Sequence, residues 1–221
     1  MKNRLLTGLM ALFSILSFQA SAQEMNDPKA KEVLDKVSSK TQQYKTITAT
    51  FTSSLENKQA GMKVDQEGVL KLKGTRFNLT LDDYNIISDG TTTWTIATAD
   101  NEVYIDNTSE MAGGDINPTE IFTMWEKGFK YKYVGEESVN GSACHHINLF
   151  PKNPKEKNYH TIKLYIGKSD LEIKKVVALG KSGDIYTYSI KSFNVNHDLA
   201  DNLFLFSKSK YPGINVVDNR F

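Results

Sequence analysis

The feature of this sequence that most constrains its fold is an alternation of apolar and polar residues, repeated in short segments along most of the chain. Ile47, Ala49 and Phe51, for example, alternate with threonines. Successive side chains of a β-strand point to opposite faces, so a period of two predicts strands with one buried and one solvated face. A helix would instead repeat its apolar residues every three or four positions. The chain is therefore predicted to be mainly β.

The alternating segments are separated by turn residues, among them Asp89-Gly90 and Asn140-Gly141, two pairs typical of tight hairpins. The predicted strands cover residues 44–55, 64–72, 77–81, 85–87, 94–96, 103–105, 129–134, 144–150, 159–166, 171–179 and 185–195. Parallel neighbours would need long crossover connections, usually helices, and the pattern provides none between consecutive segments. We therefore predict one antiparallel sheet that curls into a barrel or half-barrel.

A helix is predicted to precede the strands. Asp27 can cap its free amide groups, and Pro28 fits the first turn, where its missing N–H costs nothing. The apolar residues that follow at helical spacing are Ala30, Val33, Leu34 and Val37. This stripe is compatible with two roles: packing on the core of the sheet, or covering a cavity as a lid.

A second helix is predicted in the middle of the chain. Asn117-Pro118 is a helix start, Glu120 can reach back to the cap residue, and Gly128 marks the end. Between them lies more apolar bulk than a short surface helix needs: Ile121, Phe122, Met124 and Trp125. This helix is expected either to plug one opening of the barrel or to present part of its apolar face to a ligand.

The first 22 residues have the pattern of a removable export signal. Lys2 and Arg4 supply a positive start, residues 5–18 form an apolar core, and Ala20-Ser21-Ala22 is a small-residue cleavage site. We expect a mature chain that begins at Gln23, a residue that cannot accept a lipid anchor as a cysteine would. No repeat, low-complexity tract or linker divides residues 23–221, which are expected to form one exported, soluble domain.

Charge and cysteine content exclude several classes of protein. The chain has 27 Lys and Arg against 26 Asp and Glu, and without Lys2 and Arg4 the balance is 25 to 26. This chain lacks the basic excess on which nucleic-acid binding depends. Cys144 is the single cysteine, so no intramolecular disulfide can form and stability must come from a packed core. We expect a monomer.

The motifs of catalysis and cofactor binding are also missing. There is no glycine-rich phosphate loop and no nucleophile elbow. The nearest metal-binding candidate is Cys144-His145-His146 with His160 and His197, but adjacent residues of a strand point to opposite faces and cannot share an ion without a bulge. Nothing in the sequence indicates a lowered pKa for Cys144. We expect neither an enzyme, nor a metal site, nor a cofactor.

Four segments in a fixed order resemble the LolA family of periplasmic lipoprotein carriers over essentially the whole mature length. They are Ile47-Thr48-Ala49-Thr50-Phe51, similar to a strand with an A-x-F pattern; Glu67-Gly68-Val69-Leu70-Lys71-Leu72-Lys73, similar to G-x-L-x-x-K; Ile87-Ser88-Asp89-Gly90-Thr91-Thr92-Thr93-Trp94, which matches S-D-G-x-x-x-W; and Leu203-Phe204-Leu205-Phe206 with residues 211–218, similar to F-x-F and P-x-G-V-x-V-I-D.

The resemblance implies an incomplete antiparallel barrel whose apolar concave face is covered by a helical lid, leaving a cavity for acyl chains. It also implies lipidated proteins as cargo, received from an inner-membrane lipoprotein-releasing ABC transporter and passed to an outer-membrane acceptor. Two other roles use the same fold: a periplasmic module that senses lipoproteins, and a carrier of free lipid or glycolipid. The basic run 152–157 is expected to be a solvated loop or to dock an acidic partner or a membrane surface.

Physical chemistry shows why such cargo needs a carrier. Three long acyl chains expose on the order of 45 methylenes, and at ~0.8 kcal/mol each their transfer into water would cost roughly 35 kcal/mol. An apolar cavity must offset much of this cost. The residues predicted to line it are Val33, Leu34, Val37, Phe51, Leu70, Leu72, Phe77, Leu79, Trp94, Ile96, Ile121 and Trp125.

The sequence departs from the family pattern at one place. The family strand usually continues into Lys-Arg-Pro, whose Arg helps to hold the helical lid closed. This chain has Lys73-Gly74-Thr75-Arg76 instead, without the proline and with the arginine displaced. Lys73 and Arg76 are the candidates for lid control.

Overall fold

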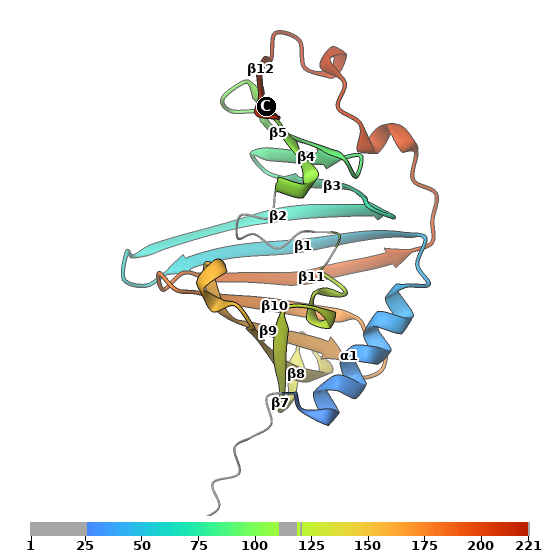
Figure 1. The fold of residues 1–221 in the computed structure, drawn as a ribbon, viewed down its shortest axis with the longest axis vertical. Helices are drawn as coiled ribbons and strands as arrows, with labels where there is room; N and C mark the ends of the chain where they lie inside the picture. Colours follow the sequence, from blue (N-terminus) through green and yellow to red (C-terminus); the bar gives the residue numbers. More distant parts are fainter. Residues whose placement is uncertain (1–25, 111–118, 120, 221) are drawn as a thin grey trace, which may run out of the picture.

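The computed structural model describes residues 26–110, 119 and 121–220. The predicted export signal, residues 1–22, lies outside these residues, as does the start of the predicted second helix at Asn117-Pro118. Figure 1 shows one large, curved sheet with a single long helix beside its lower strands. None of the described helices is long and apolar enough to span a membrane.

The strands confirm the segments predicted from the alternating pattern and add a last one that the pattern did not predict. They are β1 (Thr46–Asn57), β2 (Met62–Lys73), β3 (Arg76–Leu81), β4 (Tyr84–Ser88), β5 (Thr92–Ala97), β6 (Glu102–Asn107), β7 (Phe129–Val139), β8 (Ser142–Pro151), β9 (Tyr159–Gly167), β10 (Ile173–Gly180), β11 (Ile185–Val195) and β12 (Asn215–Asp218). The helices are α1 (Pro28–Thr41) and the 3-10 helices η1 (Thr108–Glu110), η2 (Met124–Glu126), η3 (Pro154–Glu156), η4 (Asp201–Phe204) and η5 (Lys208–Lys210).

The strands form one unclosed sheet in the order β12-β6-β5-β4-β3-β2-β1-β11-β10-β9-β8-β7. Within the described residues β12 and β7 are the two edges, so the predicted incomplete barrel is confirmed. The prediction of a purely antiparallel sheet is wrong in one respect, because β12 pairs with β6 in parallel, with Val216 opposite Val103. This last strand spans only four residues without alternation, and it reaches β6 only after the long excursion of residues 196–214.

Helix α1 begins as predicted. The Asp27 carboxylate accepts hydrogen bonds from the backbone N–H groups of Lys29 at 2.8 Å and Ala30 at 3.2 Å, which satisfies two of the free donors of the first turn. The start of the helix is also tied to the edge of the sheet, since Asp27 N–H donates to Tyr131 O at 3.2 Å. Its apolar stripe, including Val33, is buried, so α1 packs on the sheet beside β7 (Figure 1).

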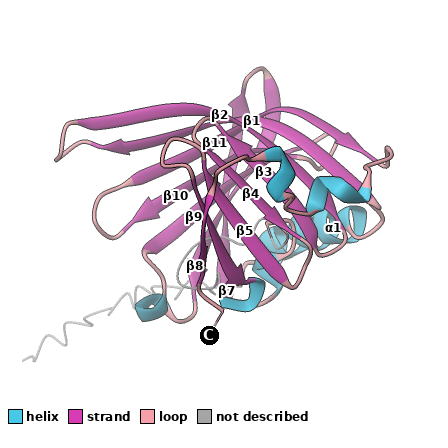
Figure 2. Cartoon of the chain, turned by 90° about the horizontal axis from the view of Figure 1, so that it is seen from above, coloured by secondary structure: helices cyan, strands magenta, loops and turns pink. Residues whose placement is uncertain are grey.

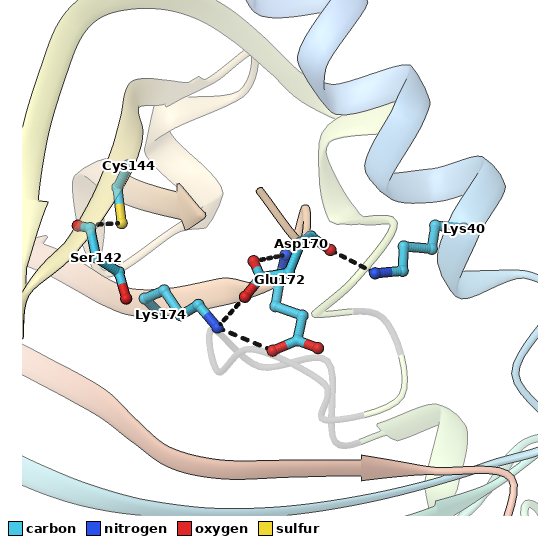
Figure 3. Close-up of polar contacts among 6 residues, drawn as sticks. All are labelled: Lys40, Ser142, Cys144, Asp170, Glu172 and Lys174. Atoms are coloured by element: carbon cyan, nitrogen blue, oxygen red, sulfur yellow. Dashed lines mark hydrogen bonds and ion pairs between the residues drawn. The ribbon is translucent and has the colours of Figure 1, made fainter. Parts of the chain in front are cut away.

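The far end of α1 is held by a small polar network. Lys40 Nζ donates to the backbone carbonyl of Asp170, in the loop between β9 and β10 (Figure 3). The Asp170 carboxylate forms an ion pair with Lys174 at 2.6 Å, and Lys174 also pairs with Glu172 at 2.9 Å. Burial opposes ionisation of Lys174, but its hydrogen bonds to the two carboxylates outweigh this and raise its pKa. Both ends of the helix are therefore anchored.

The second helix differs from the prediction. Residues 121–123 form turns, and only Met124–Glu126 adopt a short 3-10 helix. The cause is the short distance to the next element: Gly128 has a positive φ of 83°, and Phe129 already begins β7. The apolar residues are nevertheless inside the protein, since Phe122, Met124 and Trp125 are buried. Trp125 Nε1 donates to Ser38 Oγ of α1 at 3.0 Å, which joins the two segments.

Two of the apolar clusters, one large and one small, cover opposite faces of the sheet. The larger one lies on the concave face, between α1, the 122–125 segment and strands that include β1, β2 and β8–β10. The smaller one contains Ile87, Ile96, Val103 and Ile214, with Trp94, Phe206 and Tyr211 packed against it. The C-terminal excursion thus covers the convex face of β4–β6.

Candidate functional site

The concave face contains a cavity of about 580 Å³. Figure 2 shows the curvature of the sheet that creates it. Most of the wall is apolar, and it is built by β1–β4, β9–β11 and the segment before η2. The apolar and aromatic residues of the wall are Ala49, Phe51, Leu70, Phe77, Leu79, Leu81, Ile86, Ile121, Phe122, Tyr159, Ile173, Val176, Ala178, Tyr186, Tyr188, Ile190 and Phe193.

A β-bulge shapes the wall at β11. Thr50 of β1 lies opposite Ser192, whereas the next residue, Phe51, lies opposite Ile190, so Lys191 is the extra residue of the bulge. Residues separated by an odd number of positions normally point to opposite faces of a strand. The extra residue of the bulge shifts the alternation of inward and outward side chains by one position. As a result, Ile190 and Phe193 both line the cavity.

One wall of the cavity depends on a glycine. Gly68 lies opposite Phe51 across the β1–β2 ladder, and the Phe51 ring occupies the place that a side chain at position 68 would take. The ring also meets Tyr188 edge-on, with 6.0 Å between the ring centroids. Phe51 is therefore fixed against the wall by its neighbours on both adjacent strands.

The two ends of the cavity differ in polarity. Its polar lining side chains are Asn158, Ser182 and Asp184, from the start of β9 and the β10–β11 turn. These two loops are joined by a hydrogen bond from Lys181 N–H to Asn158 O at 2.9 Å. Asn158, Ser182 and the neighbouring Tyr186 are exposed. We call these four residues, Asn158, Ser182, Asp184 and Tyr186, the polar mouth.

Asp184 has the only charged side chain among the described residues that line the cavity. Its carboxylate accepts hydrogen bonds from Ser182 Oγ and from Asn57 Nδ2, the latter at 2.6 Å. These bonds hold the pKa of the Asp184 carboxyl below its ordinary value, because they stabilise the ionised form. The mouth thus carries a negative charge at neutral pH.

The opposite end is apolar and closed. Phe122 and Phe193 pack edge to face there, with ring centroids 5.7 Å apart. Both rings also border a much smaller space that lies next to Val37 and Thr41 of α1. No described residue of α1 lines the main cavity, so the aromatic pair separates the cavity from the helix.

The structure places the twelve residues predicted for the cavity in three groups. Those that line it are Phe51, Leu70, Phe77, Leu79 and Ile121. Those that are buried in the concave core without lining it are Val33, Leu34, Val37, Leu72 and Trp125. Trp94 and Ile96 differ most from the prediction, since they lie on the convex face with Ile87. Thr95 lies opposite Ile86 of the cavity wall, so its two neighbours must point the other way.

Sequence reasoning missed the contribution of β10 and β11. Ile173, Val176 and Ala178 of β10 line the cavity, as do Ile190 and Phe193 of β11. A signal for β10 was present, because Val176 and Ala178 alternate as wall residues should. In β11 the wall residues Tyr186, Tyr188 and Ile190 also alternate, and the bulge interrupts the period of two only before Phe193.

Lys73 and Arg76, the candidates for lid control, contact the C-terminal segment and not α1. Lys73 Nζ donates to Leu199 O and to Asp201, each at 2.8 Å. Arg76 forms an ion pair with the same carboxylate at 3.1 Å, and its guanidinium lies 5.4 Å from the centroid of the Phe204 ring. Hydrogen bonding and charge from Lys73, together with Arg76, lower the pKa of Asp201.

The residues considered for a metal site are dispersed. His145 Nδ1 lies 3.0 Å from Tyr133 OH on the concave side, whereas His146 pairs with Glu137 at 2.6 Å and stacks on Tyr165 on the other side of β8. In the described parts of the chain, no three His, Cys, Asp or Glu side chains are grouped to hold an ion. Cys144 is buried and donates to Ser142 O at 3.4 Å (Figure 3). Burial raises the pKa of its thiol.

A known structure shares this fold. An uncharacterized conserved protein from Thermus thermophilus is 12% identical, with a TM-score of 0.58 over 86% of this chain and 99% of the other. Lipoprotein LppX from Mycobacterium tuberculosis is 11% identical, with a TM-score of 0.49 over 79% of this chain and 100% of the other. A LolA superfamily protein from Nitrosomonas europaea is 11% identical, with a TM-score of 0.43 over 80% of this chain and 97% of the other. No curated protein matches the sequence.

The sequence itself matches a family model. Residues 42–207 match the family described as outer membrane lipoprotein carrier protein LolA. The match runs from the end of α1 to just beyond η4, and so includes every strand that lines the cavity. It covers well over half of the 221 residues. The chain therefore belongs to the LolA family of outer membrane lipoprotein carrier proteins.

Proposed function

We propose that this protein is a periplasmic carrier that binds the acyl chains of lipoproteins in its cavity and moves them from the inner to the outer membrane. The observation that carries the proposal is an apolar cavity of about 580 Å³ with polar, exposed residues at one end, in a chain of the LolA family. Residues 1–22 would direct export, and residues 23–221 would act as one domain.

The size of the cavity supports binding of a long acyl chain. If a methylene group needs about the 30 Å³ that a water molecule takes in the liquid, a cavity of about 580 Å³ has room for roughly 20 methylenes. At ~0.8 kcal/mol each, their burial offsets about 16 kcal/mol of the cost of exposure to water. Such a site holds a chain in solution, while a bilayer, which buries all chains of the cargo, remains the more favourable destination.

The role we propose is binding without catalysis and without a cofactor. An inner-membrane lipoprotein-releasing ABC transporter would load the cavity, and an acceptor at the outer membrane would empty it. The wall offers apolar contacts and few polar groups, which suits a ligand recognised by its hydrocarbon chain more than by its polar groups.

A second candidate function is the transport of a free lipid, which has fewer acyl chains than a lipoprotein. The volume of the cavity favours it, because three acyl chains with on the order of 45 methylenes exceed the roughly 20 methylenes that fit. A lipoprotein carrier of this kind must widen its cavity or hold part of its cargo outside. The two functions differ in cargo and not in the site.

Mass spectrometry of the protein purified without detergent from its native envelope separates the candidates. Triacylated polypeptide supports the lipoprotein carrier, phospholipid or glycolipid supports the second candidate, and protein without lipid argues against both. Leu79→Glu, which puts a charge into the cavity wall, should abolish co-purification. Thr80→Glu is the matched control, since the neighbouring side chain is exposed on the other face of β3.

In the native host, depletion of the protein should cause mature lipoproteins to accumulate at the inner membrane. Complementation by the Thr80→Glu variant, and its failure with Leu79→Glu, would tie this phenotype to the cavity. Unchanged lipoprotein sorting in depleted cells would contradict the proposal.

A further inference from the structure

The cavity is elongated, and its two ends differ in polarity and exposure. Along the β1–β11 ladder, Ala49 lies opposite Phe193 near the closed end and Leu55 lies opposite Tyr186 at the polar mouth. Six residues of extended β1 separate the two positions, a distance of about 20 Å. An amphiphile bound along this axis would have one end at the aromatic pair and the other at the polar mouth.

Exposure distinguishes the two ends. At the closed end Ala49 is 2% exposed and Phe122 is 8% exposed, whereas Tyr186 at the mouth is 37% exposed. A charged or hydrated group at the closed end would have to leave water without a partner, which is costly. At the mouth it keeps its water. The hydrocarbon end of a ligand is therefore stable only at the Phe122–Phe193 end.

From this polarity we infer that an acyl chain enters tail first through the polar mouth, and that its head, beside Asp184, is uncharged or cationic. The inference rests on the proposed function, because it assumes that the cavity takes acyl chains. It adds the direction of binding and the class of headgroup, which the apolar wall does not specify.

Helix α1 does not lie on this route. It contributes no described residue to the wall, and it is anchored at both ends, by Asp27 at the edge strand β7 and by Lys40 at Asp170. A ligand that enters over the rim formed by the β10–β11 turn and the start of β9 reaches the aromatic pair without displacing the helix. The helix supports the closed end of the cavity, and it does not have to open for loading.

The charge at the mouth selects among headgroups. Among the described residues of the wall, Asp184 carries the charged side chain. Lys181, in the same turn, donates its Nζ to Pro154 O and does not line the cavity. The lysines of the neighbouring 152–157 loop are also outside the wall. A carboxylate or phosphate head would therefore meet a like charge, whereas the esters and amides of a glyceride or an acylated cysteine would not.

The direction of binding can be tested with two tryptophan variants of the full mature chain. Phe122→Trp puts a fluorophore at the closed end and Tyr186→Trp puts one at the mouth, with Trp94 and Trp125 of the parent protein as background. The probes are two monopalmitoylglycerols, brominated near the methyl end or near the head. We expect the first probe to quench Phe122→Trp and the second to quench Tyr186→Trp.

The reverse quenching pattern, or equal quenching of both variants by both probes, would overturn the direction. Absence of binding by either probe to the parent protein would instead contradict the proposed function itself. Circular dichroism of each variant shows whether its fold is retained, and a Tyr188→Trp variant, halfway along the axis, serves if Phe122→Trp does not fold.

The headgroup preference can be tested with monopalmitoylglycerol, hexadecylamine and palmitate, which share one chain length. The parent protein should bind palmitate about five-fold more weakly than the glyceride, the effect of one like charge near the surface. Asp184→Asn should remove this difference. Asp100→Asn, the same charge change at the exposed β5–β6 turn, should preserve it. Equal affinity of the parent protein for palmitate and the glyceride would overturn the headgroup assignment.

Discussion

The ring of Phe51 fills the space that a side chain at Gly68 would occupy: a methyl group built on Gly68 would lie under 3.0 Å from three atoms of the ring. The two residues face each other across the β1–β2 ladder. Only glycine at this position lets the ring lie against the sheet, so the open volume of the cavity depends on this pair.

The substitution Gly68→Ala should push Phe51 into the cavity. We expect a loss of about 1–3 kcal/mol in unfolding free energy, the usual effect of overpacking, together with weaker binding of monopalmitoylglycerol. Urea denaturation and a lipid-binding titration measure the two effects. In the double variant Gly68→Ala, Phe51→Leu the smaller side chain should restore much of the stability. A double variant as unstable as the sum of the two single ones would show that the residues do not act as a pair.

The N-terminal anchor of α1 should contribute measurably to stability. Asp27→Ala removes the cap of the helix and the acceptor for Tyr133 N–H at 3.3 Å, and we expect a loss of about 1–2 kcal/mol. Asp35→Ala is the control, since it removes only an exposed i, i+4 pair with Lys31 and should cost under about 0.5 kcal/mol. Thermal and urea denaturation should rank the two variants in this order.

The contact between Asp201 and the pair Lys73 and Arg76 should make stability sensitive to acid. Hydrogen bonding and charge from Lys73, and charge from Arg76, lower the pKa of Asp201 from 3.8 in the reference state. The stabilisation is therefore present above pH 3.8 and is lost as the pH falls through the lower folded-state pKa. In Asp201→Asn the drop in unfolding free energy between neutral and strongly acidic pH should be smaller than in the parent protein. An unchanged drop would contradict the assignment.

His145 should make stability depend on pH in a higher range than Asp201 does. Burial lowers its pKa, opposed by Glu136 and assisted by the positive charges of Lys168, Lys29 and Lys36. The unfolded chain, with an ordinary pKa of 6.5, then binds this proton more readily than the folded protein. Stability is complete above pH 6.5 and declines as the pH falls below it.

The substitution His145→Gln tests this assignment. It should flatten the dependence of unfolding free energy on pH over that range, whereas His160→Gln, at an exposed position of β9, should not. Denaturation at a series of pH values compares the two variants with the parent protein.

Much of the fold could be predicted because its strands are buried on one face. The alternation in β1 and β2 and the turn residues Asn140-Gly141 are local signals, and each indicated an element that the structure contains. Strand β12 could not be predicted in this way. Its four residues pair with β6 only because residues 196–214 bring them to that edge, and no local pattern encodes such a return.

The cavity wall was harder to predict than the strands, for a physical reason. Where a strand has a covered surface on each side, apolar residues face both ways. Ile86 lines the cavity and Ile87 packs in the convex cluster, so apolar character does not identify the inner face. Trp94 and Ile96 were assigned to the wrong face for this reason. The position of α1 depends likewise on contacts such as Trp125 with Ser38, which join distant parts of the chain.

The pairing of β1 with β11 also governs how the molecule can form. Thr48 lies beside Asn194, so the centre of the sheet joins two segments that lie far apart in the sequence. Contacts of such long sequence separation slow the folding reaction, and the nascent chain cannot form its central strand pair before β11 has been synthesised. Until these two strands pair, the middle of the sheet stays accessible to proteases and to holding chaperones.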